Sequence, residues 1–98
     1  MYYIISLINT LPQHKHILLW GKGGHTFIKE TAKVKPEPVV IRHNPDAVLA
    51  VPVAEVDKLL VATTWNNNPV HALPNTPAVR AMLKVKMTRE GLVKVNRD

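Results

Sequence analysis

The sequence contains no cysteine and only one serine. Without cysteine there can be no disulfide framework, no thiolate metal site and no cysteine nucleophile, and the composition fits a reducing compartment. The single serine, Ser6, lies inside an apolar run, where a strand would point it into or across a sheet. Hydrolysis through a serine or cysteine nucleophile therefore has little support.

Long apolar segments are also missing. The N-terminal apolar run ends near residue 8, which is far too short to span a bilayer. No basic region precedes this run and no small-residue cleavage site follows it, so it does not resemble a signal peptide. We expect a cytoplasmic protein with no membrane partner.

The length and composition fit one ordinary domain. The chain has 98 residues, of which 46% are hydrophobic and 20% are charged. Dividing so short a chain would leave pieces too small for a good core. We expect a single α+β domain over residues 1–90, followed by a poorly ordered basic tail over 91–98.

Short apolar and β-branched runs dominate the first half of the chain. We expect strands over 2–8, 16–20, 25–29, 39–41 and 47–51. Three glycines in residues 21–24 predict a hairpin turn, because glycine adopts the positive φ angles that such turns need. A register with Trp20 opposite His25 would pair Leu18 with Phe27, His16 with Lys29, and Lys15 with Glu30.

Two helices are expected in the second half. Pro52 suits a first helical turn, and over 52–62 the apolar residues fall on one face. Residues 63–75 have no usable periodicity and predict a long loop. A second helix begins after Thr76, a good N-cap, with Val79, Met82 and Leu83 facing the sheet, and Gly91 ends any helix. The predicted fold class is α+β, with a small, mainly antiparallel sheet of three or four strands and two helices packed against it.

Positive charge is concentrated near the C-terminus. The formal net charge is +6, and residues 78–98 hold six basic side chains against two acidic ones. Such an excess favours an acidic partner, either nucleic acid or an acidic protein face, although it is also typical of a solvated helix surface.

Metal and phosphate sites are both weakly supported. His14, His16 and His25 supply imidazoles of the kind that bind zinc, but the expected register keeps His25 out of easy reach of His14. The glycine turn lacks the spacing of a phosphate loop and leads into a strand. We therefore expect no metal and no cofactor.

Catalysis has one weak candidate. No two acidic residues form an evident acid/base pair, so we expect no enzyme. A metal-independent ribonuclease needs less, and His71 with Arg80 and Lys84 could serve as a base and a phosphate clamp.

A binding surface is the better supported alternative. Trp65 stands in a polar segment beside three asparagines, and tryptophan and arginine are enriched at interface hot spots. Trp65 folded back onto the sheet is the alternative interpretation. The predicted partner-binding residues are Trp65, Asn66, Asn67, Asn68, Arg80, Lys84 and Lys86.

Residues 1 to about 87 resemble a group of small, uncharacterised phage and prophage proteins. The resemblance rests on the opening Met-Tyr-Tyr-Ile-Ile-Ser-Leu, the Ile17–Trp20 run with its glycine turn, Ala50-Val51-Pro52, and the spacing of Asn75, Arg80 and Leu83. It implies a protein of the host cytoplasm that binds and inhibits a host machine, such as a defence nuclease in the manner of an anti-CRISPR protein.

The sequence thus predicts a non-catalytic inhibitor of a host protein or ribonucleoprotein with an acidic surface. Direct binding of DNA or RNA through the basic second helix is the first alternative. A small ribonuclease is the second. An apolar second sheet face would also suit a homodimer.

Overall fold

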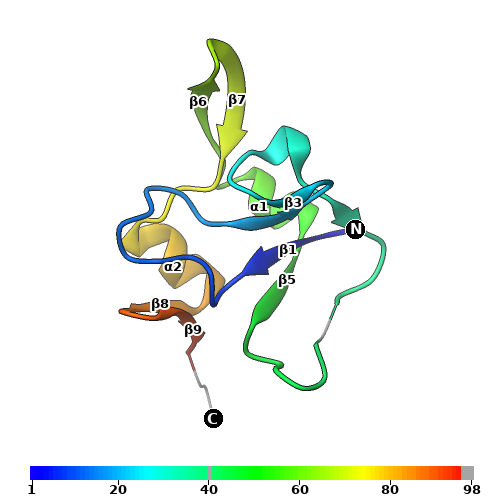
Figure 1. Ribbon diagram of the computed structural model, residues 1–98, viewed down its shortest axis with the longest axis vertical. Helices are drawn as coiled ribbons and strands as arrows, with labels where there is room; N and C mark the ends of the chain where they lie inside the picture. The colour runs from blue at the N-terminus through cyan, green and yellow to red at the C-terminus, as the bar shows by residue number, and fades with distance from the viewer. Residues whose placement is uncertain (40, 96–98) are drawn as a thin grey trace.

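The computed structural model describes residues 1–39 and 41–95 and shows a small α+β fold, as predicted (Figure 1). The described residues form nine strands, two α-helices and one 3-10 turn. In chain order these are β1 (Tyr2–Ser6), β2 (Leu19–Gly21), β3 (Gly24–Thr26), the 3-10 turn η1 (Lys29–Thr31), β4 (Val34–Lys35), β5 (Val48–Pro52), α1 (Val53–Asp57), β6 (Val61–Trp65), β7 (Asn68–Ala72), α2 (Pro77–Leu83), β8 (Val85–Thr88) and β9 (Gly91–Lys94).

The central sheet is built around β1 and is antiparallel throughout. β5 pairs with β1 along its whole length, and β2 and β4 also pair with β1. The β1 side chains at Tyr3, Ile4 and Ile5 are all buried, so both faces of this strand are covered. The predicted glycine hairpin is present between β2 and β3, with Trp20 opposite His25 as expected.

The rest of the predicted hairpin register is wrong. β3 ends at Thr26, and the chain then turns through η1 instead of continuing as a strand. His16 therefore forms an antiparallel β-bridge with Pro74 and does not pair with Lys29. The Glu30 carboxylate forms a hydrogen bond with His71 and does not pair with Lys15. Leu18 and Phe27 likewise lie outside the paired strands.

The first helix is shorter than predicted. α1 ends at Asp57, and the β-branched residues from Val61 onwards form a strand instead. Its apolar face is as expected, because Val56 is buried in the core and Leu59 and Leu60 pack against the same cluster.

The second helix begins where the sequence predicts. The Thr76 hydroxyl accepts a hydrogen bond from the Val79 backbone N–H at 3.3 Å, and Pro77 occupies the first turn. Leu83 is buried, but Met82 is 69% exposed, so its predicted place against the sheet is wrong.

The C-terminal segment is more ordered than predicted. Residues 91–94 form β9, which pairs with β8. Leu92 is 1% exposed and donates its backbone N–H to the Leu7 carbonyl at 2.9 Å. The predicted tail is therefore wrong for residues 91–94, while residues 96–98 lie outside the described part of the chain.

The expected short strand over 39–41 is absent at the two of its residues that the structure describes. Val39 and Ile41 are outside any strand and pack partly buried against the cluster of Ile4, Ala47 and Val48, while residue 40 is not described. Within residues 1–39 and 41–95, no helix has the length and apolar character needed to cross a membrane.

Candidate partner-binding site

Residues 61–72 form a hairpin that projects from the body of the molecule, and we call it the arm (Figure 1). β6 and β7 pair from Val61 opposite Ala72 to Trp65 opposite Asn68. The connecting residues Asn66 and Asn67 have φ angles of 51° and 66°, which a two-residue hairpin turn requires and which asparagine tolerates. The predicted loop over 63–75 is therefore wrong for residues 63–72 and right only for residues 73–75.

The two faces of the arm differ in burial. Successive side chains of a strand point to opposite faces, so Thr63 and Trp65 share a face with Val70 and Ala72 on the partner strand. Val70 and Ala72 are buried, which shows that this face is turned toward the body. The opposite face carries four residues, all of them exposed: Ala62, Thr64, Pro69 and His71.

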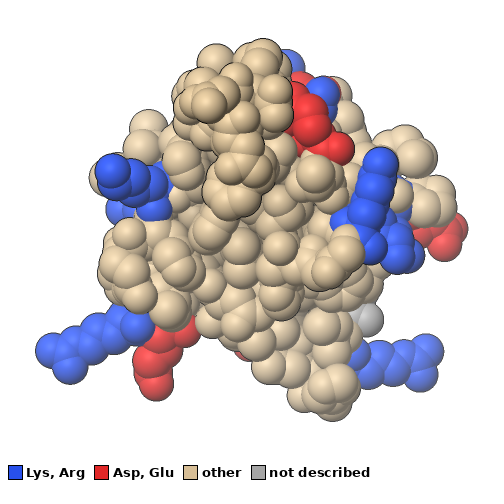
Figure 2. All heavy atoms as spheres, turned by 45° about the horizontal axis from the view of Figure 1, so that its top comes forward, with Lys and Arg blue, Asp and Glu red and all other residues tan. Residues whose placement is uncertain are grey.

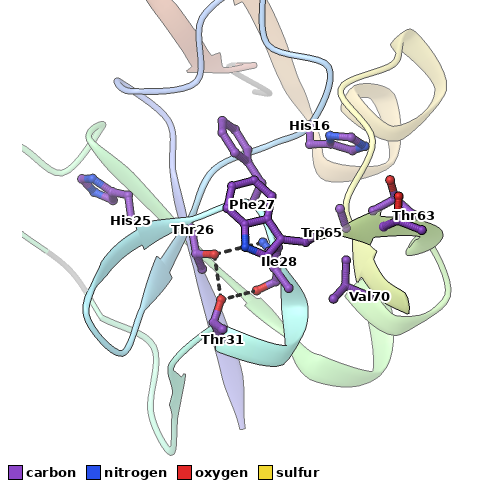
Figure 3. A pocket seen from close by; sticks show the side chains of 11 residues that line it. His16, His25, Thr26, Phe27, Ile28, Thr31, Thr63, Trp65 and Val70 are labelled. Carbon is purple, nitrogen blue, oxygen red and sulfur yellow. Dashed lines mark hydrogen bonds between the residues drawn. The ribbon is translucent and has the colours of Figure 1, made fainter. Parts of the chain in front are cut away.

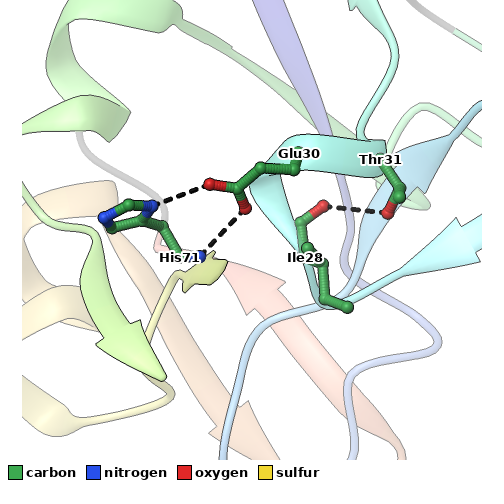
Figure 4. A network of polar contacts seen from close by, with 4 residues as sticks. All are labelled: Ile28, Glu30, Thr31 and His71. Carbon is green, nitrogen blue, oxygen red and sulfur yellow. Dashed lines mark hydrogen bonds and ion pairs between the residues drawn. The ribbon is translucent and has the colours of Figure 1, made fainter. Parts of the chain in front are cut away.

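The base of the arm is fastened to η1 and the residues before it. Ala72 forms an antiparallel bridge with Ile28. The Glu30 carboxylate accepts two hydrogen bonds from His71, one from the backbone N–H at 2.9 Å and one at Nδ1 at 2.7 Å (Figure 4). The same turn is braced by the Thr31 hydroxyl, which donates to the Ile28 carbonyl.

The Glu30–His71 contact changes the acidity of Glu30. The hydrogen bond from the His71 side chain, followed by that from its backbone N–H, holds the pKa of Glu30 below its ordinary value of 4.5. The hydrogen bonds from His71 therefore stabilise the ionised form of the Glu30 side chain.

A groove of about 490 Å³ lies between the arm and the body (Figure 3). This volume falls within the range of ordinary ligand sites, roughly 300–1,000 Å³. Hydrogen bonds from the Ile28 backbone N–H to Thr26 and between the Thr26 and Thr31 hydroxyls fix one wall. The lining residues are His16, His25, Thr26, Phe27, Ile28, Thr31, Thr63, Thr64, Trp65, Val70 and Ala72.

Trp65 is the most prominent side chain of this groove. It is 61% exposed, although it belongs to the face of the arm that is turned toward the body. In Figure 3 its side chain extends from the arm toward Phe27 and Ile28. The indole therefore borders the groove and also presents most of its surface to solvent.

The arm and the groove lining lack the four residue types Lys, Arg, Asp and Glu. The chain carries no Lys, Arg, Asp or Glu between Lys58 and Arg80, and none of these four residue types lines the groove. Figure 2 shows the arm coming forward as an uncharged surface, with charged side chains around it. This surface therefore offers apolar contact and hydrogen bonds, and no Lys, Arg, Asp or Glu side chain for an ion pair.

The predicted binding residues divide into two groups. Trp65, Asn66, Asn67 and Asn68 lie together and exposed at the tip of the arm. The basic residues Arg80, Lys84 and Lys86 lie on α2, at its C-cap and on β8, respectively, all outside the groove lining.

The Arg80 side chain is hydrogen-bonded to Asn75 of the same chain. Its Nη1 donates to the Asn75 carbonyl at 3.1 Å and to Asn75 Oδ1 at 2.8 Å. The Asn75 amide in turn donates to the His14 carbonyl. Arg80 therefore helps to fasten the start of α2, whereas Lys84 and Lys86 are exposed.

The histidines considered for zinc have other contacts. His14 Nδ1 accepts the Leu11 backbone N–H, and the His14 ring stands edge-on to Phe27 at 5.3 Å between ring centroids. Within residues 1–39 and 41–95, no group of three His, Cys, Asp or Glu side chains is placed to hold a metal ion. Ser6 is buried, and its backbone carbonyl accepts the Thr10 hydroxyl.

Sequence reasoning missed the arm and the groove. The missed signal is local, since Asn66-Asn67 is a two-residue turn pair between Val61–Trp65 and Asn68–Ala72, which contain β-branched and aromatic residues. Glu30 carried no such signal, because its partner His71 is 41 positions away. Comparisons with family models, with curated proteins and with solved structures find no match to this chain.

Proposed function

We propose that this chain is a non-catalytic binding protein that uses the arm and the groove to hold another protein. The observation that carries the proposal is the 61% exposure of Trp65 at the edge of an uncharged, partly aromatic groove. A tryptophan left in water beside such a groove gains most from being covered by a partner.

The geometry supports a protein partner in particular. Interface hot spots are enriched in tryptophan and lie in pockets that a partner desolvates, surrounded by contacts of little energy. Trp65 is suited to the first role, and the exposed asparagines of the turn, Asn66 and Asn67, are suited to the polar rim.

The proposed class of partner rests on two features of the sequence, its resemblance to small phage proteins and its net charge. The resemblance to small phage proteins supports a host protein or ribonucleoprotein as the target and inhibition as the outcome. The net charge of +6 supports a target with an acidic surface near the bound site.

Affinity capture from bacterial lysate tests the proposal when the wild type is compared with two matched variants. Trp65→Ala removes the exposed indole of the groove, and Met82→Ala removes a side chain that is 69% exposed on α2, away from the groove. We expect a discrete protein that is retained after nuclease treatment, lost with Trp65→Ala and kept with Met82→Ala. Capture that both variants retain would reject the groove as the binding site.

Direct nucleic-acid binding remains the alternative function. The side chains of Lys84 and Lys86 are exposed and available for phosphate contacts, while Arg80 donates to Asn75. Such binding would weaken steeply with salt, because each neutralised phosphate releases counterions. Material lost on nuclease treatment and insensitive to Trp65→Ala would favour this alternative.

The ribonuclease alternative has one favourable observation. Glu30 orients the His71 imidazole at Nδ1, as a carboxylate does for many catalytic histidines, and leaves Nε2 facing away from the contact. An RNA cleavage activity that His71→Ala abolishes without loss of fold would establish it, and an absence of activity in the wild type would dismiss it.

A further inference from the structure

The two edges of the arm are not equivalent. In an antiparallel ladder every second residue pair exchanges both hydrogen bonds. The Trp65–Asn68 pair, which closes the two-residue turn, is such a pair, and the next one along the arm is Thr63–Val70. The intervening residues, Ala62 and Thr64 on β6 and Pro69 and His71 on β7, therefore direct their backbone groups outward. The bond from the His71 backbone N–H to Glu30 agrees with this pattern.

The outer edge of β7 is closed. Pro69 has no N–H to offer, which is a common way to block a strand edge. The His71 N–H is taken by Glu30, and Ala72 bridges Ile28. No further strand can pair along this edge without breaking the attachment of the arm.

The outer edge of β6 is open. Within residues 1–39 and 41–95, no hydrogen bond joins the outward backbone groups of Ala62 or Thr64 to another part of the chain. Both residues are exposed and have small or β-branched side chains, with no charge or proline that would discourage pairing.

The groove borders the part of this open edge that runs from Thr63 to Trp65. Successive side chains of a strand point to opposite faces of the sheet. A hollow that lies on one face is therefore lined by alternate residues, whereas a hollow that lies at the edge of the strand is lined by consecutive residues. β6 contributes the consecutive residues Thr63, Thr64 and Trp65, whereas β7 contributes only the alternate residues Val70 and Ala72. An extended chain beside β6 would thus have free backbone partners and a hollow for alternate side chains.

We propose that the occupant of the groove is an extended segment of the partner protein, added as a strand to the open edge of β6. Resting on the proposed function, this inference adds the class of ligand. Main-chain hydrogen bonds to Ala62 and Thr64 supply affinity, and the groove selects apolar or aromatic side chains at alternate positions. The segment is uncharged where it meets the groove, because no charged residue lines it.

The probe is a displayed library of random decapeptides, selected on the immobilised wild-type protein. Thr64→Pro removes one of the two outward N–H groups of β6, and the hairpin already accommodates a proline at the cross-strand position, Pro69. Thr64→Val alters the same side chain and keeps the N–H. We expect the selected peptides to alternate apolar and polar residues, to bind Thr64→Pro at least about tenfold more weakly and to bind Thr64→Val within about threefold of the wild type.

Amide hydrogen exchange of the wild-type protein provides a second readout that requires no variant to fold. Adding a selected peptide should slow exchange at Ala62 and Thr64, with much less change at Thr63, whose N–H is directed toward Val70. The absence of enriched peptides, or binding without protection of Ala62 and Thr64, would overturn strand addition.

Self-association gives a different outcome from peptide binding. A wild-type dimer that Thr64→Pro dissociates would identify a second copy as the occupant and would also overturn the proposal. If lysate capture depends on Trp65 but is unchanged in Thr64→Pro, the proposed function stands and the mode of binding is rejected. If capture is independent of Trp65, the proposed function itself fails.

Discussion

The Glu30 carboxylate accepts two hydrogen bonds from one residue, His71, at 2.9 Å from the backbone N–H and 2.7 Å at Nδ1. Glu30 belongs to η1 and His71 to β7, so this contact joins the arm to the body across 41 positions of sequence. It also satisfies the one outward N–H that β7 would otherwise present to another strand.

The first prediction concerns the pH dependence of this contact. The pKa of Glu30 is lowered in the folded state, so ionised Glu30 stabilises the fold at pH values above 4.5, its ordinary pKa. That contribution disappears as the pH falls through the lowered pKa. The side chains of His71 and Glu30 are 50% and 40% exposed, so we expect an effect of about 1 kcal/mol or less.

Urea unfolding of the wild type and Glu30→Gln from pH 7 down to pH 3 measures this effect. Glutamine keeps the shape and one acceptor oxygen but cannot ionise. The variant should be less stable at pH 7, and the difference should vanish at the acid end. A difference that stays constant across the series would show that the charge of Glu30 does not contribute.

The second prediction concerns Gly91, at the start of β9. Its φ angle is +130°, and an added Cβ would lie 2.8 Å from the Leu7 carbonyl oxygen. The backbone conformation alone should make Gly91→Ala destabilising by about 1–3 kcal/mol, and the clash with backbone adds to this cost. Gly23→Ala is the control, because nothing lies within 4 Å of its Cβ position. Equal thermal midpoints for the two variants would contradict the close packing of β9 on Leu7.

The third prediction separates binding from stability at the arm. Trp65→Ala should change the free energy of unfolding by less than about 1 kcal/mol, because most of the side chain is already in water. Leu73→Ala, just after the arm, removes a fully buried side chain and should cost about 2–5 kcal/mol. Calorimetric unfolding of both variants checks this, and a large loss for Trp65→Ala would mean that the indole supports the fold.

The fourth prediction concerns Lys84, which ends α2 in the left-handed conformation with a φ angle of 60°. A non-glycine residue in this region costs roughly 1–2 kcal/mol, partly offset by the greater chain entropy that glycine loses on folding. Lys84→Gly should therefore raise the free energy of unfolding by roughly 0.5–1 kcal/mol. Lys86→Gly, within β8, should lower it. Denaturant unfolding that shows a loss for both would refute the strain at Lys84.

Local signals in the sequence were sufficient for several elements. The β-branched run of β1, the glycine turn after Trp20 and the Thr76-Pro77 start of α2 each depend on neighbouring residues, and all three are present. The predicted α+β class followed from these elements and is confirmed.

Longer-range features were beyond such reasoning. The apolar spacing of Leu59 and Leu60 extended the predicted helix past Asp57, although the residues that follow favour a strand. The groove is assembled from three separate segments of the chain, and the Glu30–His71 contact joins two of these segments. Because neither partner shows a pattern of its own, the sequence predicted Trp65 as a binding residue, left its exposure open and did not predict the hollow beside it.

Because no Lys, Arg, Asp or Glu lies in the stretch between Lys58 and Arg80, salt should affect the association and the dissociation of a bound partner differently. Under the proposed function, the positive charge outside this stretch would accelerate the approach of an acidic partner, and salt would screen that attraction. The arm itself offers no Lys, Arg, Asp or Glu with which a partner could form an ion pair, so salt would have little to weaken there. For a partner held there, added salt should slow association while the lifetime of the complex stays nearly constant.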